Sequence, residues 1–83
     1  MDADTKQRIE EATKIAFEKY AERHPTLGIF LETNNSELLT LAVESIENDP
    51  DVEEAMQLAR TENDLQKLVE IAEIYLPKII GLL

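Results

Sequence analysis

Carboxylates make up most of the side chains that could do chemistry, because the chain has no cysteine and only one histidine. A general base needs a partner group within hydrogen-bond reach, and Glu22 points to another side of the helix that carries His24. His24 precedes a proline at the predicted helix end, where an imidazole can cap free carbonyl groups. Adjacent acids such as Glu53 and Glu54 point about 100° apart on a helix, so they do not converge on one substrate. We therefore expect a protein that is not an enzyme.

Alternating acids in the segment that begins at Asp49, with the sequence DPDVEE, raise the question of a calcium loop. The sixth position of that loop needs glycine and holds Glu54, and the twelfth needs a bidentate glutamate and holds Arg60. The acids are explained instead by the positive end of a helix dipole, which favours carboxylates in the first turn. We expect no metal and no cofactor.

Negative charge is concentrated in the middle third of the chain. The formal net charge is −10, and residues 32–64 alone contribute −9, with Arg60 as their only base. Such a surface repels phosphate, which disfavours direct contact with nucleic acid or an anionic membrane, and attracts basic surfaces. We expect a non-enzymatic interaction or regulatory protein that presents this acidic surface to a basic protein. The expected contact residues are Glu37, Glu44, Glu47, Asp51, Glu53 and Glu54.

Two alternatives remain open at this level. The same carboxylates would serve a nucleic-acid mimic that inhibits a DNA- or RNA-binding protein. The chain would also suit a homodimeric assembly module, with an apolar C-terminal segment as the interface. The residues of that interface would be Leu76, Ile79, Ile80, Leu82 and Leu83.

Hydrophobic periodicity predicts an all-α fold, a small compact bundle of four helices with a possible short extra helical segment at 25–33. The predicted helices are 5–23, 34–48, 50–60 and 65–83. On the first helix, one face gathers Ile9, Ala12, Thr13, Ala16, Phe17 and Tyr20.

Capping residues set the expected helix starts. Asn34 and Glu37 have capping-box spacing, as do Thr61 and Asp64. Asp49 is expected to cap the next helix, with Pro50 in its first position.

The most apolar stretch is the last quarter, Leu65 to Leu83, which we expect to be the central helix. Its apolar face continues in phase past Pro77, which predicts a kinked continuation or a second short turn with the proline facing water.

Length and composition predict one domain, 1–83, since 83 residues allow one core. The absence of cysteine fits a reducing compartment, and the acidic start MDADTKQRIEE does not fit a signal peptide. The apolar runs are too short to span a bilayer. We expect a cytoplasmic protein.

Overall fold

The computed structural model describes residues 3–81, and 86% of them are helical, with no strand in this part of the chain. The predicted all-α fold is confirmed. The elements are α1 (Ala3–Arg23), the 3₁₀ helix η1 (Pro25–Leu27), α2 (Gly28–Thr33), α3 (Asn35–Glu47), α4 (Val52–Thr61) and α5 (Gln66–Ile80).

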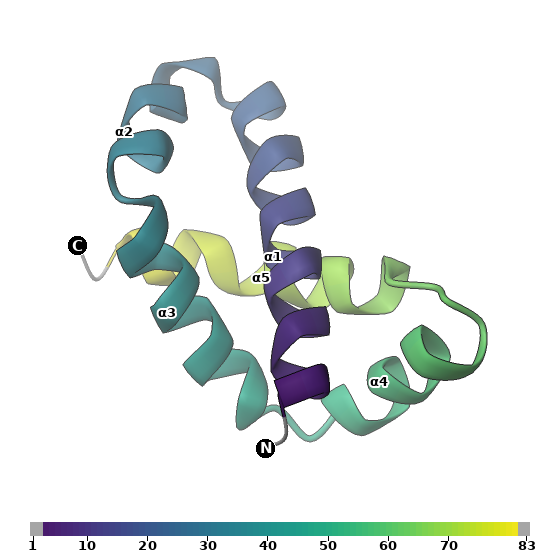
Figure 1. The fold of residues 1–83 in the computed structure, drawn as a ribbon. Coiled ribbons are helices and arrows are strands. Elements are labelled where there is room, and N and C mark those ends of the chain that lie inside the picture. The colour runs from purple at the N-terminus through teal and green to yellow at the C-terminus, as the bar shows by residue number, and fades with distance from the viewer. Residues whose placement is uncertain (1–2, 82–83) are drawn as a thin grey trace.

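Helix α5 is the element that the other long helices share. It packs against α1, α3 and α4, which confirms the prediction that the last helix is central. Figure 1 shows the chain rising through α1, turning over at η1 and α2, and descending through α3. Helix α4 then lies beside the N-terminal end of α1, and α5 crosses behind α1 in this view.

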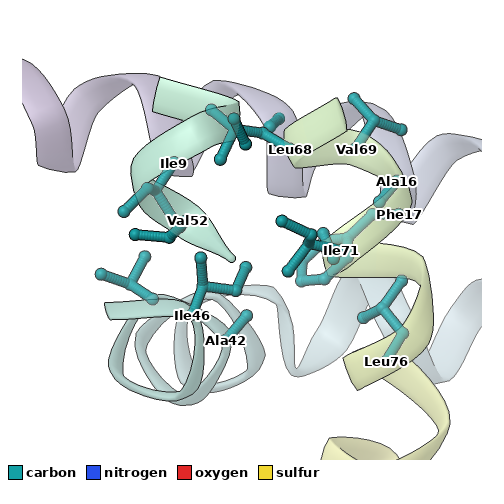
Figure 2. Packing of buried hydrophobic residues seen from close by; sticks show 14 of the residues in the cluster. Ile9, Ala16, Phe17, Ala42, Ile46, Val52, Leu68, Val69, Ile71 and Leu76 are labelled. Carbon is teal, nitrogen blue, oxygen red and sulfur yellow. The ribbon is translucent and has the colours of Figure 1, made fainter. Parts of the chain in front are cut away.

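The core is built from apolar side chains of every α-helix. Figure 2 shows Ile9 of α1, Ile46 of α3 and Ile71 of α5 directed toward a common interior. Each fully buried aliphatic side chain contributes roughly 1.5–3 kcal/mol relative to leaving it in water. Met56 is also buried, as expected of a gap-filling side chain. The largest fully buried side chains are Ile9, Leu38, Ile46, Leu68, Val69, Leu76 and Ile79.

The apolar stripe predicted on α1 is the face that α1 buries, with Tyr20 half-buried at its end. Thr13 is a polar member of this stripe, and its hydroxyl donates a hydrogen bond to the Ile9 carbonyl at 2.7 Å. The buried hydroxyl is therefore satisfied. Ile15 lies off the stripe and is exposed.

Helix α1 ends at Arg23, and the next residue, His24, has a φ of −133° and a ψ of 70°, outside the helical region, as the following proline favours. The His24 ring lies against Tyr20, with centroids 4.4 Å apart. It makes no hydrogen bond to a carbonyl within residues 3–81. The predicted capping role of the side chain is wrong, because stacking on the aromatic ring holds the imidazole instead.

Both predicted capping boxes are also wrong. The Asn34 side chain donates to the Phe30 carbonyl at 2.9 Å, so it closes α2 instead of opening α3. The Thr61 hydroxyl donates to the Gln57 carbonyl at 2.8 Å, again within the preceding helix. Each side chain bonds to a carbonyl one turn earlier in the chain, and this bond competes with capping the next helix.

The start of α4 is two residues later than predicted, at Val52. The predicted cap is therefore wrong: Asp51 holds the N-cap position without a side-chain cap bond, and Asp49 accepts the Asp51 backbone N–H at 2.8 Å within the turn before the helix. Pro50 lies in a turn between the two helices.

Helix α5 continues through Pro77 to Ile80 without a separate short turn. Pro77 is exposed, which confirms that the proline faces water. The predicted end of this helix at Leu82 and Leu83 lies outside the described residues.

Candidate functional site

The six acids expected to form a recognition surface lie on two helices and the turn between them. Five are exposed and Glu47 is half-buried. The structure brings Glu44, Glu47 and Glu53 together around two neighbouring hollows. It does not bring Glu37, Asp51 or Glu54 into either hollow.

The first hollow lies between α1 and α3 and has a volume of about 280 Å³. Its apolar part is Leu39 and Val43, and its acids are Glu44 and Glu47 of α3 with Glu10 of α1. Lys6 and Thr40 complete the lining. A side chain that enters this hollow would meet both apolar side chains and carboxylates.

The second hollow lies where α1, α3 and α4 meet, with a volume of about 440 Å³. Glu47 and Glu53 line it together with the buried side chains of Val52 and Met56, and Arg60 stands at its edge. Glu47 lines both hollows, so they form one continuous surface, which we call the Glu47 surface.

Hydrogen bonds between α1 and α4 fix the second hollow. Arg8 donates from Nη1 to the Ala59 carbonyl at 3.0 Å, and the Arg60 guanidinium donates to the Thr5 hydroxyl. Ala59 is in the last turn of α4, where free carbonyls give the helix end a partial negative charge that favours a cation. These bonds hold α4 against the first turns of α1.

The turn between α3 and α4 is held by α5. Tyr75 donates its hydroxyl proton to Asp49 Oδ2 at 3.0 Å. The hydrogen bond to Asp49, partial burial and the negative charges of Asp49 and Asp51 raise the pKa of Tyr75 above its usual value of 10.0. The turn, and with it the start of α4, is therefore tied to the central helix.

Among the described residues, no cation forms a close ion pair with an acid of the Glu47 surface. Within residues 3–81, the ion pairs are Arg8–Asp4 at 3.3 Å and Arg23–Glu73 at 3.0 Å. Neither involves an acid of the predicted surface. Lys6 and Arg60 share the hollows without approaching these carboxylates to ion-pair distance.

Sequence reasoning missed the contribution of α1. Lys6 and Glu10 lie one turn apart on the edge of the buried stripe, and Glu10 directly follows the buried Ile9. Residues that flank a buried stripe border the neighbouring helix, and this signal could have identified Glu10. The sequence pattern of α1 does not show which helix packs beside Glu10, because the contact with α3 depends on tertiary packing.

The expected apolar interface at the C-terminal end divides into three parts. Leu76 and Ile79 are buried in the chain's own core, with exposed fractions of 0% and 1%. Ile80 is half-buried against that core. Leu82 and Leu83 lie outside the described residues.

No group of three or more histidine, cysteine, aspartate or glutamate side chains within residues 3–81 is arranged to hold a metal ion. In the same part of the chain, no helix has the length and apolar character needed to cross a membrane. Comparisons with protein families, with curated proteins and with solved structures find no significant match.

Proposed function

We propose that this chain is a non-enzymatic interaction protein that binds a basic protein partner through the Glu47 surface. The observation that carries the proposal is the position of Glu47, which joins two acid-lined hollows across α1, α3 and α4. In this role the chain would regulate its partner by covering a basic surface.

The lining of the first hollow suits the side chain of lysine or arginine. Both have an apolar stem and a charged end. The stem would pack on Leu39 and Val43, and the charged end would meet Glu10, Glu44 and Glu47. Charge-assisted hydrogen bonds to carboxylates are about twice as strong as neutral ones, and an arginine can bind a carboxylate through two bonds at once.

The apolar residues favour a protein partner over the alternative of nucleic-acid mimicry. A mimic reproduces the regular phosphates of a nucleic-acid backbone and needs its negative charges spread along an extended face. In this chain the carboxylates of Glu44, Glu47 and Glu53 lie around apolar side chains, which are those of Leu39, Val43, Val52 and Met56. Such a mixture fits side chains that have an apolar stem.

The test uses a short peptide of alternating arginine and serine as the probe, titrated by calorimetry and followed by NMR. The decisive variant replaces Glu44, Glu47 and Glu53 by glutamine. We expect its affinity for the peptide to fall about tenfold, which corresponds to about 1.4 kcal/mol. In the wild type, chemical-shift changes should be largest at Leu39 and Val43.

The matched control replaces Glu11, Glu32 and Glu62 by glutamine, which removes the same charge from exposed positions outside the two hollows. We expect less than about a twofold loss, because none of these three carboxylates lines either hollow and exposed charges that make no direct contact are weakened by salt screening. Equal losses in both variants would mean that the peptide responds to net charge alone, and the proposal would fail.

A further inference from the structure

Helix α4 contributes little to the deepest part of the core. Among residues 3–81, the largest fully buried side chains all belong to α1, α3 and α5, and none belongs to α4. The buried side chains of α4 are two alanines, Ala55 and Ala59, together with Val52 and Met56. Helices α1, α3 and α5 pack against one another in all three pairs. They form a three-helix body whose own contacts do not depend on α4.

Polar contacts fasten both ends of α4 to this body. Before the first residue of α4, Tyr75 of α5 bonds to the turn that leads into the helix, at 3.0 Å. In the last turn, Arg8 of α1 donates to the Ala59 carbonyl at 3.0 Å, and Arg60 donates to the Thr5 hydroxyl. All three bonds are only partly buried. Water can replace such bonds when α4 moves away, so each of them holds the helix weakly.

Negative charge favours the release of α4 from the body. Residues 49–62 contain five acids and one base, which gives them a formal net charge of −4. Glu47, in the last turn of α3, lines the second hollow together with Glu53 of α4. Neither of the ion pairs formed within residues 3–81 includes a residue of this segment. Repulsion between these carboxylates is therefore relieved when α4 moves away from α3.

The short length of α4 means that its release and its unfolding occur together. The helix has ten residues, and isolated helices shorter than about 12–15 residues are marginal in water. Once α4 is detached, its backbone hydrogen bonds therefore break as a group. The connection to α5 holds Asn63 at a φ of 52°, in the left-handed region, which residues other than glycine adopt at some cost. Release removes this constraint as well.

We propose that α4 detaches and unfolds as a unit while α1, α3 and α5 stay folded, and that the second hollow exists only while α4 is bound. Detachment removes four lining residues of that hollow, which are Val52, Glu53, Met56 and Arg60. The first hollow is lined by α1 and α3 alone and stays formed. A partner that fills both hollows then holds α4 closed. This effect on binding rests on the function proposed for the Glu47 surface, whereas the opening itself needs no partner.

Native-state hydrogen exchange of the whole chain, followed by NMR without a partner, tests the opening. We expect the amides of residues 56–61 in α4 to have protection factors at least about tenfold smaller than those of residues 70–76 in α5. Low urea concentrations should accelerate the α5 amides more, because global unfolding exposes more surface than the release of one helix. Protection factors and urea dependences that are the same in both helices overturn the proposal. So do α4 amides that exchange one by one without any urea dependence, as a fraying helix end does.

Ile79→Val separates the release of α4 from global unfolding. Ile79 is 1% exposed and lies in the last turn of α5, at the end of that helix away from α4 (Figure 1). Its contacts survive the release of α4, so only global unfolding becomes easier. We expect protection in α5 to fall about fivefold and protection in α4 to change less than about twofold. Equal falls in both helices would mean that α4 opens only by global unfolding, and the proposal would fail.

Arg8→Gln removes the bond to the Ala59 carbonyl, which is lost both in the release of α4 and in global unfolding. Protection in α4 and in α5 should therefore fall together, by about fivefold. The matched control is Asp4→Asn, which removes only the exposed ion pair between Arg8 and Asp4 and should change protection in α4 less than about twofold. If Arg8→Gln left the protection of α4 unchanged, this contact would not hold α4 closed and the proposed mechanism would be wrong.

Discussion

Tyr75 shows how a single polar contact positions part of the Glu47 surface. Its hydroxyl reaches from α5 to Asp49, and the other oxygen of Asp49 accepts the Asp51 N–H. The Asp49 carboxylate therefore bonds both within the turn and to the central helix α5. Glu53 and the rest of the first turn of α4 follow this turn directly.

Replacing Tyr75 by phenylalanine removes this contact and little else. We expect the free energy of unfolding at pH 7 to fall by about 1 kcal/mol, the usual net contribution of a side-chain hydrogen bond. Urea denaturation monitored by circular dichroism measures the change. Tyr20→Phe is the control, because the Tyr20 hydroxyl makes no hydrogen bond to residues 3–81, and it should change the stability less.

The pH dependence of the same variant gives a second readout. The fold raises the pKa of Tyr75, so the folded state holds the phenolic proton more tightly than the unfolded state, whose pKa is about 10. The stability from this group is then fully present below pH 10 and is lost as the pH rises through the raised folded value. The difference between wild type and Tyr75→Phe should shrink above about pH 10. A constant difference would contradict this role of the proton.

Single polar residues were the part of the fold that sequence reasoning predicted least well. Asn34 and Thr61 each stand at a junction where two helices offer free backbone groups. A short side chain can bond to either helix at similar cost, so spacing alone does not decide between them. Asp49 was also predicted to cap a helix, and its carboxylate bonds instead within the turn that precedes α4.

Among the elements, the helices and their buried faces were predictable because burial repeats with the helical period. The stripe on α1 and the central place of α5 both follow from where apolar residues recur. The hollows were not predictable in the same way. Glu10 and Glu44 come together only because α1 packs beside α3, and the local pattern of each helix does not contain that angle or register.

Pro77 lies inside α5 and gives a prediction at this scale. A proline has no N–H for the Glu73 carbonyl, and its ring crowds the preceding turn, which costs about 3 kcal/mol relative to alanine in a helix interior. Pro77 is exposed, so alanine loses little packing. Alanine makes the unfolded chain more flexible than proline does, and this gain in entropy offsets about 0.4–1 kcal/mol of the stabilisation. We expect Pro77→Ala to raise the free energy of unfolding by about 2–2.6 kcal/mol.

Thermal and urea unfolding measure this change, with wild type and variant compared at the same protein concentration. Leu76→Ala is the contrasting variant, since Leu76 is fully buried and its truncation should cost about 2–5 kcal/mol. If Pro77→Ala lowered the stability, the proline ring would have to contribute to the packing of α5.

The whole molecule carries a formal net charge of −10, so the acids of the Glu47 surface repel one another in the folded state. Glu44, Glu47 and Glu53 border the same surface and lie outside the ion pairs formed within residues 3–81. Bringing them together therefore lowers the stability of the fold unless a cationic partner or salt is present. Stability and binding should change in opposite directions when these acids are neutralised.

The variant with glutamine at Glu44, Glu47 and Glu53 tests this opposition. At low ionic strength we expect the free energy of unfolding of this variant to be about 0.5–1 kcal/mol higher than that of the wild type, a gain that surface-charge optimisation commonly gives. The gain should shrink as sodium chloride is added, because screening removes the repulsion in the wild type. The control variant with glutamine at Glu11, Glu32 and Glu62 loses the same charge and should gain less. Equal gains in the two variants would mean that these acids lower the free energy of unfolding only through the net charge. The effect on stability would then not indicate where a partner binds.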